Sequence, residues 1–288
     1  MPELPEVEVV KRSLASKTLN LIIKSVKIID DKLRYKVNKN QIKKIVGLKL
    51  QKILRRSKYL LFFFDKNVVM LVHLGMTGKF FFIEKNKKYK TSFYYEISED
   101  KDRKHNRIEF NFSENKKLIY NDIRKFGFIK LFSKIDLYQN SHLKNLGPEP
   151  LSKKFNLIYF KKYLVGRNRT VKDILMDQKF VSGLGNIYVN EVLFFSGIKP
   201  TKKIKKLSDV EIKKIIKFTK KILSKAIILG GSSIKNFSSS SGKKGSFQQH
   251  FGVYGRKDEI CTNFKCNENI KKIVIANRAT FYCGNCQK

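Results

Sequence analysis

The sequence predicts an α+β protein in three parts: a β-sandwich that carries one N-terminal helix, then a helical domain, and last a small metal-binding β-hairpin. Short apolar runs between turn residues fill positions 1–135, which is typical of strands. Apolar residues recur at helical spacing over 153–250. All 4 cysteines lie in the last segment, 251–288. Residues 136–152, which are polar and contain prolines, are predicted to be the linker.

In the first domain, Val7, Val10 and Leu14 repeat at helical spacing and predict a helix over residues 5–19. Residues 75–78, which include two glycines, predict a tight corner between strands. The apolar runs that predict strands lie at residues 59–64, 68–74, 79–83, 108–112, 118–121 and 128–132.

The second domain is predicted to be helical, and its longest helix has the clearest boundaries. Ser208 and Glu211 form a capping box at its start, and Gly230 and Gly231 end it. Shorter helices are predicted over residues 155–164, 171–177 and 187–195, and a serine-rich loop over 238–245.

Composition points to a folded protein with an anionic partner. Of 288 residues, 42% are hydrophobic, including 23 Phe and 12 Tyr, so wholesale disorder is excluded. The net charge of +38 favours nucleic acid first and an anionic membrane second, although an AT-rich genome also raises the lysine content. No apolar run reaches the ~18 residues of a membrane helix. Because the acidic, proline-bearing N-terminus is not a signal peptide, we expect a cytoplasmic protein with no membrane partner.

The cysteines form two close pairs, Cys261 with Cys266 and Cys283 with Cys286. In a reducing compartment this clustering indicates a metal rather than disulfides or free thiols. The β-prone segment between the pairs suits one tetrahedral Zn²⁺ on a hairpin. Four thiolates leave no open position for water, so the zinc is expected to be structural. Arg278 near the hairpin tip could enter a groove or meet phosphates.

The N-terminus carries a second group of reactive residues. Pro2 follows the initiator methionine, and we expect removal of Met1 to leave a secondary amine. An α-amine titrates near pH ~8 and attacks an aldehydic carbon to form an iminium. Glu3 and Glu6 then lie together at the positive end of the first helix. The alternative is a frayed terminus with ordinary capping acids.

Two further sites are ambiguous by themselves. Residues 183–186 precede a helix and offer backbone N–H groups to a phosphate, with Asn186 as an added donor, or they form only a turn. Lys58 enters an apolar strand, where a lysine is usually a solvated edge residue.

Together these motifs resemble the Fpg/Nei family of DNA glycosylases, and the resemblance runs from end to end. It is carried by residues 2–6, 56–61, 73–78, 121–127, 146–151, 185–188, 230–235 and 253–256 and by the cysteine hairpin. The family's fold is a catalytic β-sandwich with an N-terminal helix, a helix-two-turn-helix domain and a zinc-finger hairpin. The resemblance thus implies a bifunctional DNA glycosylase and abasic-site lyase of base excision repair.

The resemblance also implies roles for particular residues. Pro2 would attack C1′ of a damaged purine nucleotide, such as 8-oxoguanine or a formamidopyrimidine, and form a Schiff base. Glu3 would protonate the ring oxygen, and Glu6 would hold the first helix. Lys58 would clamp the phosphates beside the lesion. Arg278 would hold flanking phosphates and serve the second of two eliminations, β then δ.

The implied partner is double-stranded DNA that contains an oxidised base or an abasic site. A flipped base leaves a gap, which Met76, Arg124 and Phe126 would fill. Core packing is the alternative for Met76 and Phe126, but Met76 lies in a glycine turn. The resemblance implies a monomer with one structural zinc. The remaining residues implied to bind DNA are His73, His105, Arg167, Arg169, Lys172, Asn186 and, in the loop over the flipped purine, Lys235.

The sequence departs from the family's pattern at two positions, and two alternative functions remain. Ser241 stands where relatives often have aspartate, and Asn277 precedes the finger arginine in place of glycine or glutamine. An endonuclease VIII-like enzyme for oxidised pyrimidines is disfavoured by Leu4 and by the three gap-filling residues. A non-catalytic zinc-ribbon nucleic-acid binder explains the charge and the cysteines, but leaves Pro2, Glu3 and Lys58 without a role.

Overall fold

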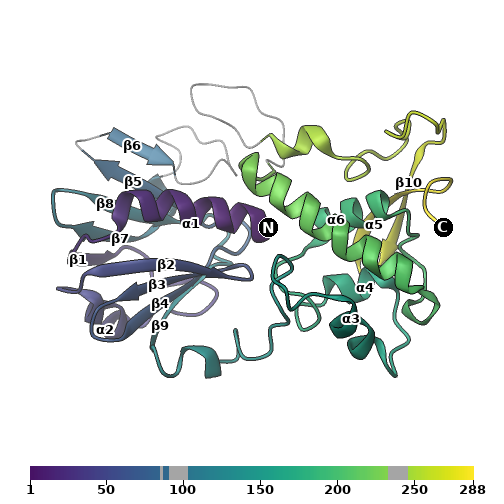
Figure 1. The fold of residues 1–288 in the computed structure, drawn as a ribbon. Helices are drawn as coiled ribbons and strands as arrows, with labels where there is room; N and C mark the ends of the chain where they lie inside the picture. The colour runs from purple at the N-terminus through teal and green to yellow at the C-terminus, as the bar shows by residue number, and fades with distance from the viewer. Residues whose placement is uncertain (85–86, 91–102, 233–245) are drawn as a thin grey trace. The chain divides into compact units, whose positions relative to one another are not determined.

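The computed structural model describes residues 1–84, 87–90, 103–232 and 246–288, with no side chains for 87–90. The chain forms two compact units, residues 1–144 with 230–246, and residues 145–229 with 247–288 (Figure 1). The units therefore divide the chain differently from the predicted domains. The segment after the longest helix belongs to the first unit, and the cysteine hairpin belongs with the helices. In the described part of the chain, no helix is long and apolar enough to cross a membrane.

The first unit contains two antiparallel sheets (Figure 1). The four-stranded sheet has the order β2 (Leu50–Arg56), β3 (Tyr59–Phe64), β4 (Val68–His73) and β9 (Phe128–Ser133). The five-stranded sheet has the order β1 (Ile23–Ile28), β7 (Asn106–Phe112), β8 (Lys117–Asn121), β5 (Lys79–Glu84) and β6 (Lys87–Lys90). Short helices complete the unit: α2 (Lys39–Ile42), η1 (Lys43–Ile45), η2 (Arg103–His105) and η3 (Leu137–Gln139).

Helix α1 (Leu4–Thr18) joins the core between the sheets. Its Val7, Val10 and Leu14 belong to one buried cluster that includes Phe62 of β3 and Phe80 of β5. The predicted sandwich with its N-terminal helix is thereby confirmed. The predicted strands all form, with ends within two residues of their expected positions.

The sequence patterns did not predict strands β1, β2 and β6. Register shifts interrupt the pairing between Ile23 and Ser25 in β1 and between Leu50 and Lys52 in β2. A bulge inserts an extra residue and breaks the period-two alternation by which a strand is predicted. Strand β6 was not predicted because residues 84–90 are mostly charged and show no alternation of apolar and polar residues.

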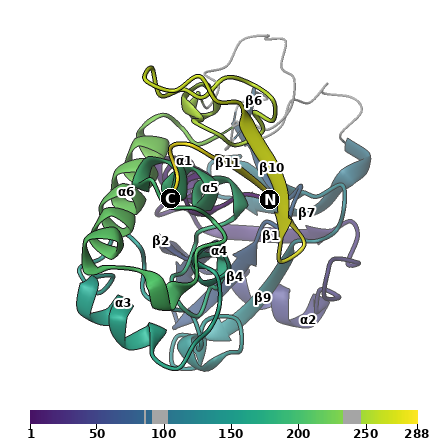
Figure 2. The ribbon, with the colours of Figure 1, turned by 90° about the vertical axis from the view of Figure 1, so that its right-hand side faces the viewer.

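The second unit contains the predicted helices: α3 (Leu157–Leu164), α4 (Val171–Met176), α5 (Asn186–Ser196), and α6 (Asp209–Ile228), with the single turns η4 (Ile204–Lys206) and η5 (Phe247–His250). The capping box of α6 is present, because Ser208 Oγ accepts from Glu211 N at 3.2 Å and Ser208 N donates to Glu211 Oε2 at 3.0 Å. Strands β10 (Ile270–Ile275) and β11 (Arg278–Cys283) form the hairpin (Figure 2). Ala276 and Asn277, both at positive φ, make its two-residue turn.

Candidate active site and nucleic-acid interface

The N-terminus is buried and hydrogen-bonded. Glu3 is the N-cap of α1 and forms a capping box with Glu6, in which Glu3 N donates to Glu6 Oε2 at 2.9 Å. Pro5 occupies the first turn, where its missing N–H costs nothing. Pro2 is buried, and the exposed fractions of Glu3 and Glu6 are only 4% and 3%. This order does not fit the frayed-terminus alternative.

The α-amino group has a pKa below its usual value. Burial is the largest cause, and Glu3 and Glu6 oppose it, while the charges of Lys58 and Arg124 lower the pKa further. The amine belongs to Met1 here, and the Pro2 nitrogen lies one residue away. A lower pKa leaves a larger fraction of the Met1 amine neutral at pH 7.

Glu6 also fixes the chain segment that follows α6. Its Oε1 accepts hydrogen bonds from Ser232 N at 2.8 Å and from Ser232 Oγ at 3.0 Å. Gly231 has φ +80°, and a Cβ there would lie 3.0 Å from Glu6 Oε1. These contacts explain why the segment after α6 belongs to the first unit. Lys235 and the serine-rich loop lie outside the described residues.

Lys58 lies in the turn between β2 and β3 and is only 7% exposed. Arg55 Nη1 donates to the carbonyl of Ser57, the residue just before Lys58, at 3.0 Å. The same guanidinium donates from Nε to Glu8 Oε2 at 3.0 Å. Glu8 of α1 thus positions the turn that carries Lys58. Sequence reasoning missed this pair because its members are 47 residues apart.

His73 ends β4 and supports the glycine turn that follows it. Its Nδ1 accepts from Gly75 N at 3.1 Å, and its ring stacks on Phe128 with centroids 5.5 Å apart. Burial, then the charges of Lys58 and Arg34, lower the pKa of His73 to about 4. The ring is therefore neutral at physiological pH, and Nδ1 remains an acceptor. A contact of His73 with DNA stays a prediction.

This pKa predicts an acid sensitivity of the first unit. The folded pKa of about 4 lies below the ordinary value of 6.5, so the unfolded chain takes up the proton first as the pH falls. The neutral His73 ring contributes its full share to the free energy of unfolding above pH 6.5. As the pH falls toward 4 this contribution is lost, and the free energy of unfolding drops by at most about 3 kcal/mol. We expect His73→Asn, whose amide oxygen can still accept from Gly75 N, to flatten the stability change between pH 7 and 4.5. Urea unfolding of both proteins at pH 7 and at pH 4.5 measures how much free energy of unfolding each loses between the two pH values. An equal loss in the two proteins would contradict the prediction.

The three predicted gap-filling residues lie on two turns of the first unit. Met76 is half-buried, and Arg124 and Phe126 are exposed. Phe126 is 44% exposed, which excludes the core-packing alternative for this side chain. The Arg124 guanidinium carbon lies 4.6 Å from the centroid of the Phe126 ring. These two side chains are therefore stacked on each other in the free protein. Their insertion into DNA stays a prediction.

His105 ends η2, and its carbonyl accepts a hydrogen bond from Asp122 N at 3.0 Å. Its Nδ1 lies 3.4 Å from Arg107 Nη2. The structure thus connects His105 to the segment that carries Arg124. Its contact with DNA is not tested by these bonds and also stays a prediction.

In the second unit, Lys172 and Asn186 both contact the cysteine hairpin. Asn186 Nδ2 donates to the Ala279 carbonyl at 2.9 Å. Lys172 is 1% exposed, and its Nζ donates to the same carbonyl at 3.1 Å and to Thr280 Oγ1 at 2.6 Å. The acceptors directly follow Arg278, so both residues fix the start of β11. Whether they also reach phosphates stays a prediction.

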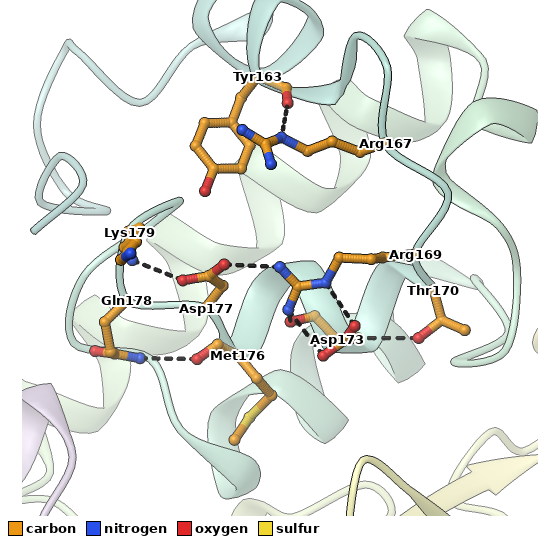
Figure 3. Close-up of polar contacts among 9 residues, drawn as sticks. All are labelled: Tyr163, Arg167, Arg169, Thr170, Asp173, Met176, Asp177, Gln178 and Lys179. Atoms are coloured by element: carbon orange, nitrogen blue, oxygen red, sulfur yellow. Dashed lines mark hydrogen bonds and ion pairs between the residues drawn. The ribbon is translucent and has the colours of Figure 1, made fainter. Parts of the chain in front are cut away.

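Arg167 and Arg169 differ in their surroundings (Figure 3). Arg167 donates from Nε to the Tyr163 carbonyl at 2.8 Å, and its guanidinium lies over the Tyr163 ring at 4.3 Å. Arg169 is held by two carboxylates, with Nε 2.6 Å from Asp173 Oδ2 and Nη1 2.7 Å from Asp177 Oδ2 (Figure 3). Hydrogen bonding to Asp173 raises the pKa of Arg169 above its usual value. DNA contacts of both arginines stay predictions, and that of Arg169 would have to compete with two ion pairs.

The four cysteines converge in space. All four sulfurs lie within 4.8 Å of one another, with Cys266 Sγ 3.6 Å from Cys283 Sγ and Cys261 Sγ 3.9 Å from Cys286 Sγ. A tetrahedral zinc with Zn–S bonds of about 2.3 Å places its sulfurs about 3.8 Å apart. The donor set therefore fits one Zn²⁺. Arg278 begins β11 beside the turn at the other end of this hairpin, as the sequence predicted.

Buried polar side chains of α5 anchor the same hairpin and the segment before it. The Glu191 carboxylate accepts hydrogen bonds from the N–H groups of residues 252–254 at 2.7, 3.1 and 2.8 Å. Asn190 Oδ1 accepts from Phe281 N at 2.7 Å. Burial raises the pKa of Glu191, and the three N–H donors oppose the shift. These contacts explain why the hairpin belongs with the helices. The sequence did not single out Asn190 or Glu191, because no local pattern around them indicates a partner far along the chain.

Comparisons with known proteins agree with this architecture. Residues 1–129 match the family model of the formamidopyrimidine-DNA glycosylase N-terminal domain, and residues 146–238 match the model of that family's H2TH domain. The formamidopyrimidine-DNA glycosylase of Rickettsia bellii (strain OSU 85-389) is 42% identical over 288 residues, with 100% of both chains covered. That of Rickettsia felis is 39% identical over 287 residues and covers 100% of this chain and 98% of the relative.

Solved structures give the same result. The complex between the Lactococcus lactis Fpg and an abasic-site-containing DNA matches with a TM-score of 0.84 and 34% identity, covering 99% of each chain. A complex of the Lactococcus lactis protein with a Fapy-dG-containing DNA also has a TM-score of 0.84, with 33% identity, and covers 99% of this chain and 100% of that one. With two family models and full-length relatives in agreement, the chain belongs to the formamidopyrimidine-DNA glycosylase family, whose members are DNA glycosylases and abasic-site lyases.

Proposed function

We propose that this enzyme excises oxidised purines, 8-oxoguanine and formamidopyrimidines, from duplex DNA through the N-terminal amine of Pro2. After removal of Met1, the Pro2 nitrogen attacks C1′, and the base leaves with the electron pair of its bond to C1′ and takes up the proton that the Pro2 nitrogen loses. The carboxyl group of Glu3 gives its proton to the ring oxygen, so the bond from C1′ to that oxygen breaks, the sugar opens and the nitrogen lone pair completes an iminium. The observation that carries this proposal is the ordered start of α1, where Pro2 is buried next to the buried carboxyl group of Glu3.

The iminium makes the C2′ protons acidic. Removal of one C2′ proton expels the 3′ phosphate in β-elimination, and a second elimination expels the 5′ phosphate and leaves a one-nucleotide gap. In this proposal Lys58 holds the phosphates beside the lesion, and Arg278 serves the second elimination. Neither step requires a metal, which agrees with four cysteines that would fill a zinc coordination sphere.

The remaining contacts of the proposal concern binding. Met76, Arg124 and Phe126 fill the gap left by the flipped base, and their partial or full exposure on adjoining turns supports this role. One structural Zn²⁺ is held by Cys261, Cys266, Cys283 and Cys286. We further propose that the enzyme acts as a monomer in the cytoplasm, on the DNA of the nucleoid, where its net charge of +38 favours binding to phosphates.

Borohydride trapping tests the nucleophile. Reduction converts the iminium into a stable amine, so enzyme mixed with duplex that carries 8-oxoguanine opposite cytosine should form a covalent protein–DNA adduct. Peptide mapping should place the link on the Pro2 nitrogen. Enzyme that keeps Met1 is the control, because its Pro2 nitrogen is acylated, and it should form no adduct at that position. An adduct through a lysine, with Pro2 unmodified, would refute the proposal.

A further inference from the structure

Two turns of the first unit meet backbone to backbone. They are residues 74–78, which carry Met76, and residues 122–127, which carry Arg124 and Phe126. Gly75 has φ +63°, and a Cβ there would lie 2.4 Å from Gly127 N and 2.4 Å from the Phe126 carbonyl carbon. No side chain fits between the two turns at this point. The two turns are therefore in direct backbone contact at this point.

A buried carboxylate joins the same two turns. Asp122 is 0% exposed, and its Oδ1 accepts a hydrogen bond from Thr77 Oγ1. Its Oδ2 accepts from Gly127 N at 2.8 Å. Thr77 Oγ1 in turn accepts from Arg124 N at 2.9 Å. Asp122 therefore holds both ends of the segment 124–127, one directly and the other through the Thr77 hydroxyl.

The backbone of Asp122 is fixed as well. Its carbonyl accepts from Arg107 Nε at 2.9 Å, and Arg107 Nη1 lies 2.7 Å from Asp30 Oδ2. The same oxygen of Asp30 lies 2.8 Å from Lys125 Nζ, in the middle of the second turn. Lys125 has φ +57°, a conformation that a non-glycine residue adopts only when its surroundings hold it. The second turn is thus held from both of its sides.

We propose that the Thr77 hydroxyl and the Asp122 carboxylate form a brace that makes Met76, Arg124 and Phe126 one preformed wedge. Thr77 and Asp122 are positioning residues, because they act through the wedge side chains. The inference rests on the proposed function and specifies how its base-flipping step is supported.

The brace matters because extrusion of a base costs stacking and pairing free energy, which the inserted side chains must offset. Side chains that become ordered only on binding contribute less to the net binding free energy, because their ordering costs conformational entropy. Two turns that are joined before binding avoid this loss. Loss of the brace should therefore slow entry of the lesion into the site but leave the chemistry at an already extruded abasic site unchanged.

Three substitutions separate the brace from general stability. Thr77→Val keeps the shape of the side chain and removes the hydroxyl, whereas Thr77→Ser keeps the hydroxyl. Thr18→Val is the matched control, because the buried Thr18 hydroxyl donates to the Leu14 carbonyl at 2.8 Å at the far end of α1. Met76→Ala measures the contribution of the wedge itself. Thermal unfolding of each variant identifies any that fail to fold.

The assay compares two rates. One is the single-turnover excision of 8-oxoguanine opposite cytosine, and the other is the cleavage of a duplex of the same sequence in which an abasic site replaces the 8-oxoguanine. We expect Thr77→Val to slow excision about tenfold, as for loss of a buried hydrogen-bonded link, and to change abasic cleavage less than about twofold. Thr77→Ser and Thr18→Val should match the parent enzyme in both assays. In a Met76→Ala background, Thr77→Val should have a smaller effect on excision than in the parent, because Met76 is no longer there to be positioned while Arg124 still is.

Each outcome decides the inference. Equal losses on both substrates, a Thr77→Ser enzyme as slow as Thr77→Val, or full additivity with Met76→Ala would refute the brace. An effect of Met76→Ala without one of Thr77→Val would refute the brace alone and keep the wedge. Failure of the proposed function looks different, because the parent enzyme would then neither excise 8-oxoguanine nor form an adduct at Pro2.

Discussion

Glu3→Gln should slow excision of 8-oxoguanine by at least about a hundredfold, the usual contribution of a positioned proton donor. Glutamine has nearly the same shape, and its amide oxygen can still accept from the backbone N–H of Glu6 in the capping box. Helix α1 and the buried terminus should therefore persist, while the proton for the sugar ring oxygen is lost. Single-turnover excision with excess enzyme measures the effect without a contribution from product release.

The capping box of α6 offers a matched control for this substitution. Glu211→Gln makes the same carboxylate-to-amide change in a second capping box, at its N3 position, where Glu211 Oε2 accepts from Ser208 N. It also removes the ion pair between Lys202 Nζ and Glu211 Oε1, so its stability should fall at least as much as that of Glu3→Gln, while its excision rate should stay near that of the parent. A Glu3→Gln enzyme of normal rate would show that another group supplies the proton. Similar rate losses in both variants would indicate a structural effect.

Cys283→Ser should remove the metal and weaken duplex binding by at least about a hundredfold, because metal binding supplies much of the folding free energy of so small a hairpin. The buried cluster around the hairpin is small, and its members include Phe194, Val253, Ile270, Phe281 and the cysteines themselves. Cys283 is 0% exposed and lies at the end of β11, the strand that Arg278 begins. Loss of the metal should therefore also loosen the hairpin that carries Arg278.

Elemental analysis and fluorescence anisotropy at one fixed salt concentration test this prediction, since binding to phosphates depends steeply on salt. The parent should contain one zinc per chain, and Cys283→Ser none. Thr262→Ser, an exposed change next to Cys261, should keep both zinc and affinity. The first unit has its own core and should keep its near-native unfolding transition in all three proteins. A Cys283→Ser protein with normal zinc content and normal affinity would contradict the metal assignment.

Local patterns in the sequence were sufficient for many elements of the fold. The helical spacing of Val7, Val10 and Leu14 predicted α1, and the capping box at Ser208 predicted the start of α6. The cysteine spacing predicted one metal site on a hairpin, and the four sulfurs do converge. The two helix features could be predicted because they depend on interactions between residues close in the sequence, and the metal site could be predicted because the spacing of its four cysteines is distinctive. The bulged strands β1 and β2 could not, since a register shift disrupts the local pattern itself.

The sequence also suggested candidate catalytic residues, because Pro2, Glu3 and Lys58 lie in the motifs that carry the resemblance to the family, and their roles stay predictions. Only the tertiary structure decided what holds such residues in place. Glu8 reaches Arg55 across 47 residues, Thr77 reaches Asp122 across 45, and Glu191 reaches Gly252 across 61. Each of these polar side chains is wholly or partly buried and must find a hydrogen-bond partner, but burial depends on the packed fold and leaves no local signature. The sequence by itself therefore determined the family and the candidate residues, and the packed structure determined which distant side chains hold the segments that carry them.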